Sequence, residues 1–235
     1  RAVALDEETG AVLWTHEWHT SYRMLMASYA VGPRATPTVD GDRVYVVGAT
    51  GRLFCLDVET GDVIWGKDYV ADYGTSVPTW GIASAPLVDR DKLITVVGGE
   101  PDALVVAFDK RTGEEIWRAV QVVGEMGYGQ PVIYEAGGTR QLIVWHPTAL
   151  TFLNPETGAV YWDQPWEVRE SISVATPARG GDYLLVSQFY RGPMMMRLSA
   201  DRPEATLLWQ GTGRDSLPNQ TDGLHAMITT PVIIG

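Results

Sequence analysis

The chain has 235 residues, of which 45% are hydrophobic, with nine tryptophans and a formal net charge of −11. This length and hydrophobicity allow one large β domain and argue against a disordered chain. The negative charge disfavours nucleic acid as a partner, because its phosphates would be repelled. No apolar run reaches the roughly 18 residues that a membrane-spanning helix needs, so the sequence predicts no transmembrane segment.

The first recurring phrase spans residues 5–14, where Leu-Asp is followed by Thr-Gly and then by a tryptophan. It returns at 56–65, 108–117 and 153–162, and a worn copy at 198–209 has lost the Thr-Gly step. The phrase predicts a tight hairpin, because the Asp or Asn side chain accepts turn amides and the glycine supplies a positive φ. A period of about 45 to 50 residues indicates stacked supersecondary units.

A second phrase, a small or polar residue followed by proline and apolar residues, lies between the copies of the first. It occurs at 36–39, 85–88, 130–133, 176–178 and 230–233. A turn rich in Gly or Asp follows each complete copy, and then a β-branched apolar run. Each unit therefore reads as four short antiparallel strands joined by tight turns, and no helical period is evident.

Four-stranded units of this length predict an all-β fold, a β-propeller built from antiparallel blades. Complete blades are expected at about 33–68, 83–118, 129–164 and 174–210. Residues 1–17 would be two strands of an earlier blade, and residues 228–235 the first strand of a later one. We expect an incomplete arc of a larger ring, with an exposed blade face at each end that favours self-association. The alternative, a small ring closed by a composite blade, would leave that blade with only three strands.

The Asp-x-x-Thr-Gly-x-x-x-Trp phrase resembles the tryptophan-docking repeat of the pyrroloquinoline-quinone (PQQ) β-propellers. Residues 32–65 look most like bacterial PQQ-binding-like β-propeller repeat proteins. That superfamily includes quinoprotein alcohol and glucose dehydrogenases. It also includes quinone-free relatives, such as the propeller lipoprotein of the bacterial outer-membrane barrel-assembly machine. The resemblance implies a periplasmic or extracellular location.

The repeated tryptophans occupy one position of the outermost strand in each unit. We expect each to pack against the next blade, with its indole N–H donating to a backbone carbonyl. Repetition in every unit indicates structural docking rather than catalysis. The docking residues are Trp14, Trp65, Trp117, Trp162 and Trp209.

Function is expected where the copies differ, in the loops that enter the innermost strands and ring one mouth of the channel. These loops hold a mixed polar and aromatic set that can converge on one ligand. The candidates are Arg34, Trp80, Ser84, Glu125, Tyr128, Gln130, Arg169, Glu170, Ser171, Asn219, Asp222 and His225. For any single residue, an ordinary solvated loop position is the alternative.

Two further segments raise the question of metal binding. The insert 16–32 contains His-x-x-His, but without a nearby carboxylate or cysteine set we expect a packed flap rather than a metal site. Met194, Met195 and Met196 alternate faces on a strand, so they are expected to fill gaps rather than to hold one ion. No metal ligand is predicted.

The favoured function is a non-catalytic binding or scaffold module that presents its mouth loops to a protein or polymer partner, or to a small ligand, with no cofactor. The alternative is a PQQ- and calcium-dependent quinoprotein dehydrogenase that oxidises an alcohol or sugar. The resemblance implies adjacent cysteines for many such enzymes, whereas Cys55 stands alone in an apolar run and is expected to be buried and inert. The candidate loops hold the carboxylates of Glu125, Glu170 and Asp222. None of them can be aligned with the calcium ligands of the quinoprotein dehydrogenases. A sugar- or polymer-processing propeller is a third class.

Overall fold

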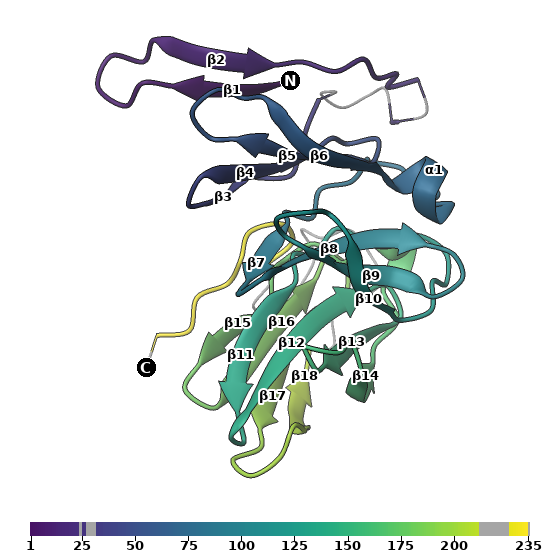
Figure 1. Cartoon of the computed structure of the whole chain (residues 1–235). Coiled ribbons are helices and arrows are strands. Elements are labelled where there is room, and N and C mark those ends of the chain that lie inside the picture. Colours follow the sequence, from purple (N-terminus) through teal and green to yellow (C-terminus); the bar gives the residue numbers. More distant parts are fainter. Residues whose placement is uncertain (24, 27–31, 212–225, 235) are drawn as a thin grey trace. The chain divides into compact units, whose positions relative to one another are not determined.

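The computed structural model describes residues 1–23, 25–26, 32–211 and 226–234. Within these residues nearly all regular structure is β, arranged as one two-stranded and four four-stranded antiparallel sheets (Figure 1). The chain divides into two compact units, Arg1–Val122 and Val123–Gly235. The expected all-β architecture of four-stranded antiparallel blades is thereby confirmed.

The first unit contains the two-stranded sheet and two four-stranded sheets, and each strand pairs with its neighbour in sequence. The two-stranded sheet consists of β1 (Ala2–Leu5) and β2 (Val12–His16). The next sheet is β3 (Thr38–Asp40), β4 (Arg43–Val47), β5 (Arg52–Asp57) and β6 (Val63–Asp68). After α1 (Tyr69–Tyr73) come β7 (Leu87–Asp89), β8 (Lys92–Gly99), β9 (Ala103–Asp109) and β10 (Glu115–Ala119).

The second unit repeats this plan in two four-stranded sheets. The first comprises β11 (Val132–Ala136), β12 (Thr139–His146), β13 (Ala149–Leu153) and β14 (Val160–Pro165). A 3-10 turn, η1 (Arg169–Ser171), precedes the second sheet. That sheet comprises β15 (Ala178–Gly180), β16 (Tyr183–Gln188), β17 (Gly192–Leu198) and β18 (Ala205–Gln210).

The Thr-Gly turns have the local geometry that their sequence predicts. Asp57 Oδ1 accepts hydrogen bonds from Glu59 N and Thr60 N, both at 2.9 Å, and Gly61 adopts φ +74°. These amide bonds lower the pKa of Asp57, because they favour its charged form. A register shift follows on β5, between Cys55 and Leu56, and irregularities at matching places occur in the other sheets.

The structure differs from the sequence-based expectation in two places. The connection after β6 forms α1, which Asp68 caps by accepting from Val70 N (3.1 Å) and Ala71 N (3.3 Å) and which Gly74 ends at φ +66°. Its 5 residues are too few to show a helical period in the sequence. Among residues 226–234 no strand forms where 228–235 was expected to begin a blade.

The core of each unit lies in the middle two strands of its complete sheets. In the second unit a single apolar cluster draws on both sheets, and it includes Trp145, Phe152, Val186, Met194 and Met196. Met194 and Met196 are fully buried whereas Met195 is half-buried, so the three methionines alternate faces as expected. No helix in the described part of the chain is long and apolar enough to cross a membrane.

Candidate functional site

Two of the repeated tryptophans contact the Thr-Gly turn of the following sheet in the first unit. Trp14 Nε1 donates to Val58 O at 2.9 Å, and Trp65 Nε1 donates to Lys110 O at 3.2 Å. A Cβ added at Gly61 would lie 2.6 Å from the Trp14 ring, and one added at Gly113 would lie 2.7 Å from the Trp65 ring. Each turn glycine therefore serves the turn and leaves room for the indole.

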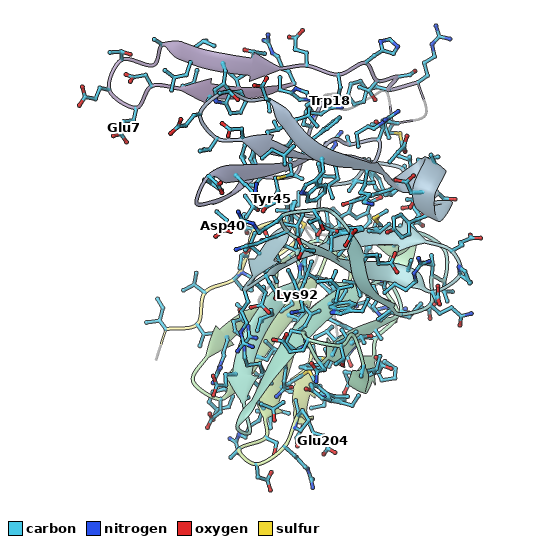
Figure 2. All side chains as sticks on the ribbon, viewed as in Figure 1. Glu7, Trp18, Asp40, Tyr45, Lys92 and Glu204 are labelled. Carbon is cyan, nitrogen blue, oxygen red and sulfur yellow. The ribbon has the colours of Figure 1, made fainter. Side chains whose placement is uncertain are left out.

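Lys110 is the centre of the second of these contacts. Its carbonyl also accepts from the hydroxyl of Tyr45 at 2.9 Å, and its ammonium group lies 2.6 Å from Asp40 Oδ2. Tyr45 and Asp40 belong to β4 and β3 (Figure 2). This end of the two sheets is thus joined by backbone, side-chain and ionic contacts, which gives it a structural role.

The remaining tryptophans differ from one another. Trp117 is 7% exposed on β10, and Trp162 stacks on Phe152 with ring centroids 4.5 Å apart. The indole N–H of Trp162 is buried and has no hydrogen-bond partner among the residues that the structure describes. Trp209, on β18, is 46% exposed. The turn that begins at Ser199 lacks the Thr-Gly step, which agrees with the lack of a described hydrogen-bond acceptor for the Trp162 N–H.

We call the loops at one end of the four-stranded sheets the mouth loops. They comprise the connections that enter each first strand and the turns between each second and third strand. These segments hydrogen-bond to one another: Tyr69 N donates to Gly51 O at 2.9 Å, and Val122 N donates to Pro101 O at 3.1 Å. The mouth loops are therefore tied to the sheet ends.

The insert after β2 packs against mouth loops of the first unit over the part that the structure describes. The ring of Trp18, labelled in Figure 2, lies 3.1 Å from the place of a Cβ at Gly48. Thr20 Oγ1 lies 2.6 Å from Thr50 Oγ1. Leu25 is buried, and Met26 N donates to Thr79 O at 3.1 Å. Residues 24 and 27–31 of the expected flap lie outside the described residues.

The candidate residues of the first unit lie in the connections that lead into β3 and β7. Arg34 is exposed in the segment before β3, and Trp80 is half-buried. Ser84 is 5% exposed, and no hydrogen bond from its buried hydroxyl is formed with any described residue.

In the second unit the structure joins two pairs of candidates. The Tyr128 hydroxyl donates to Glu125 Oε2 at 2.8 Å, and Tyr128 N donates to Ser173 O at 2.9 Å. Arg169 Nε lies 3.6 Å from Glu170 Oε1 in η1. Gln130 is half-buried before β11. Asn219, Asp222 and His225 lie outside the described residues.

The second pair borders a hollow of about 490 Å³. Its lining is Glu167, Val168, Arg169, Glu170, Ser171 and Arg191. Two mouth loops contribute: the β14–β15 connection with η1, and the turn between β16 and β17. Sequence reasoning missed Arg191 as a site residue, and its only signal was a place beside Phe189-Tyr190 in a hairpin turn.

The backbone beneath this hollow is strained and firmly anchored. Glu170 and Ser171 adopt φ values of 56° and 57°, a region that residues with a Cβ rarely occupy. Val168 N donates to Pro147 O at 2.7 Å, and Trp166 N donates to Thr148 O at 3.0 Å. Strain of this kind persists where surrounding contacts hold it, and it is common at binding sites.

A buried histidine ends β12, next to the turn that anchors this loop. His146 is 6% exposed, with Nε2 at 2.9 Å from Thr151 Oγ1 and Nδ1 at 3.1 Å from Thr148 Oγ1. Burial lowers the pKa of His146 to about 4, because the charged imidazolium is poorly solvated there. The imidazole is therefore neutral at neutral pH.

The donor chemistry of the described residues bears on cofactors. No group of three His, Cys, Asp or Glu side chains within that part of the chain is close enough to hold a metal ion. Cys55 is fully buried, and burial raises the pKa of its thiol to about 11. The thiol is therefore protonated at neutral pH.

Comparisons with known proteins agree with this architecture. The family described as "Outer membrane protein assembly factor BamB" matches residues 1–228. The quinohemoprotein alcohol dehydrogenase ADH IIB of Pseudomonas putida is 31% identical over 148 residues, which cover 60% of this chain and 21% of that protein. The chain thus spans about a fifth of the length of this relative.

Two solved structures share the fold. BamB from Moraxella catarrhalis superposes with a TM-score of 0.61 and 20% identity, covering 89% of this chain and 54% of that one. A europium-containing methanol dehydrogenase superposes with a TM-score of 0.52 and 15% identity, covering 88% of this chain and 47% of that one. At these identities the likeness shows the β-propeller fold.

Proposed function

Because the chain belongs to the family described as outer membrane protein assembly factor BamB, a family of PQQ-like β-propellers, we propose that it is a non-catalytic binding module. Its mouth loops hold a polypeptide partner. The family description, an assembly factor, supports a role in holding other proteins. In this proposal the protein works in the periplasm or outside the cell.

The observation that carries the proposal is the hollow beside η1. It has the size of an ordinary ligand pocket and is lined by charged side chains from two loops. Both loops connect strands of the four-stranded sheets, and the η1 loop is hydrogen-bonded to the β12–β13 turn beneath it. A scaffold that fixes variable loops in this way is the usual arrangement of a binding surface.

The experiment places a photo-crosslinking amino acid at single positions in cells that produce the protein natively. Position 167 lies at the hollow, and position 157 lies in the Thr-Gly turn at the other end of β13 and β14. Both Glu167 and Thr157 are exposed, so the pair is matched. A partner crosslinked from 167 but not from 157 supports the proposal. Crosslinking from 157 alone, or equally from both, contradicts it.

The second candidate function is a PQQ- and calcium-dependent dehydrogenase. The 31% identity to ADH IIB over 60% of the chain favours it. The test is titration of the full-length protein with PQQ and calcium. A red-shifted spectrum of bound quinone together with alcohol-dependent dye reduction would overturn the non-catalytic proposal, and the absence of both would support it.

A further inference from the structure

The hollow beside η1 brings two arginines from separate loops to one space. Arg169 belongs to η1, and Arg191 to the turn between β16 and β17, 22 positions later in the sequence. The hydroxyl-bearing Ser171 lines the same hollow. Guanidinium groups bind carboxylates through planar, two-pronged hydrogen bonds, and a serine hydroxyl can donate a further one.

Arg169 is held by an aromatic ring. Its guanidinium carbon lies 5.0 Å from the centroid of the Tyr190 ring, and that ring contacts Phe189 edge to face at 5.0 Å. Stacking on a ring restricts the side chain while the edge of the guanidinium plane can still donate hydrogen bonds. Restriction before binding lowers the entropy cost of binding. The arrangement therefore favours a ligand group over a solvated, mobile arginine.

Glu170 already places a carboxylate near Arg169, but at poor geometry. The distance from Arg169 Nε to Glu170 Oε1 is 3.6 Å, which exceeds hydrogen-bond length. The two side chains are 49% and 59% exposed, and exposed pairs of this kind contribute little. A better-placed carboxylate would displace this contact.

We propose that the hollow is a carboxylate-binding site in which Arg169 and Arg191 hold the carboxylate and Glu170 competes for Arg169. The carboxylate comes from an acidic side chain of an extended polypeptide, a source that rests on the proposed function. The net charge of −11 repels strongly acidic molecules at a distance. The site therefore selects a single acidic residue in a neutral segment rather than an acidic run.

The test uses nitrogen-15-labelled full-length chain and three probes: acetyl-Gly-Gly-Glu-Gly-Gly-amide, its Gln counterpart, and glutarate. The amides of Ser171 and Gly192 report binding by their chemical shifts. We expect the Glu peptide to bind and the Gln peptide not to bind. Arg169→Gln and Arg191→Gln should each weaken binding about tenfold, the usual effect of losing a charged hydrogen bond. Glu170→Gln should strengthen binding about two- to threefold, because the competing charge is removed.

Two variants control for charge and folding. Arg202→Gln removes an exposed arginine that pairs with Glu204 at 2.8 Å in the turn at the other end of β17 and β18, and it should leave binding unchanged. Arg169→Lys keeps the positive charge but loses the two-pronged geometry, and it should bind less tightly than the parent. Unchanged amide spectra away from the hollow show that each variant is folded.

The outcomes separate this inference from the proposed function. Tighter binding of the Glu peptide than of glutarate supports a polypeptide source. Equal binding of both, lost in Arg169→Gln, supports the carboxylate site and assigns it to small acids. No shift with any probe, or binding unaffected by Arg169→Gln and Arg191→Gln, overturns the site. The crosslinking result at position 167 does not depend on these titrations.

Discussion

The two units differ in how a repeated tryptophan meets the neighbouring sheet. In the first unit an indole N–H reaches a turn carbonyl twice, from Trp14 and from Trp65, and the turn glycine makes room for the ring. In the second unit the indole N–H of Trp162 is buried without a described partner, and a large apolar cluster spans both sheets. The comparison teaches that the repeated tryptophan need not dock through its N–H, because in the second unit the apolar cluster and a hydrogen bond from the Tyr134 hydroxyl to Pro177 O (2.9 Å) join the two sheets.

The largest expected effect tests whether the docked tryptophans hold the first unit together. Trp65→Ala should lower the free energy of unfolding by about 2–4 kcal/mol, somewhat less than truncation of a fully buried large aromatic, because the ring of Trp65 is half-buried. Trp209→Ala is the matched control, because its 46% exposed ring should cost below about 1 kcal/mol. Urea denaturation measures both. Equal losses would contradict the assignment of Trp65 to a seam.

The second prediction concerns acid stability of the second unit. The folded-state pKa of His146, about 4, lies below its ordinary value of 6.5, so the unfolded chain binds a proton more readily. The contribution of the neutral His146 to the free energy of unfolding is fully present above pH 6.5. It is lost as the pH falls toward 4, by about 3 kcal/mol in total. His146→Gln should flatten this part of the profile of unfolding free energy against pH. A slope that survives the substitution would assign the acid sensitivity to other groups.

A pair of glycine substitutions separates the close approach of the ring from the backbone requirement. Gly113→Ala places a Cβ 2.7 Å from the Trp65 ring at φ +74°, whereas Gly10→Ala meets nothing within 4 Å at φ +68°. Both substitutions place a Cβ on a left-handed backbone, so this strain is common to the two variants. Gly113→Ala should lower the free energy of unfolding by about 1–3 kcal/mol more than Gly10→Ala, because its Cβ overpacks against the indole. Thermal or urea unfolding checks the difference. Equal costs would mean that the indole moves aside without penalty.

The smallest effect sharpens the comparison of the two seams. Trp65→Phe and Trp162→Phe remove the same atoms, but only Trp65 loses a hydrogen bond, to Lys110 O. Trp65→Phe should therefore cost about 1–2 kcal/mol more than Trp162→Phe, which removes a buried N–H without a described partner. Denaturant unfolding of the two variants measures this. A larger cost at Trp162 would show that its N–H is satisfied in solution.

Much of the fold was predictable from local pattern. The alternation of turn motifs and apolar runs predicted the positions of the four complete sheets. Hairpin geometry depends on nearby residues such as Asp57 and Gly61, so a local pattern is enough to predict it. The sequence also marked Tyr128 with Glu125, and Arg169 with Glu170, as candidates that the structure brings into pairs. The five-residue α1 went unpredicted, since a single turn leaves no periodic signal.

The candidate site was only half predictable. Arg191 joins the hollow from a turn that breaks no repeat, and its one signal, a place beside Phe189-Tyr190, does not mark it as a site residue. The left-handed backbone at Glu170 and Ser171 was equally hidden, because neither residue type favours that conformation. Arg34 and Trp80, chosen by the same reasoning as Arg169, lie in the first unit and do not line this hollow.

By itself the sequence determined the family, the order of the strands and the turn chemistry, because each depends on short, repeated, local signals. Tertiary structure alone decided which side chains share a space. Arg169 and Arg191 meet because η1 and the β16–β17 turn lie at the same end of the second unit. The contacts of Trp14 and Trp65 likewise needed three dimensions, since their acceptors, Val58 and Lys110, lie 44 and 45 residues away along the chain.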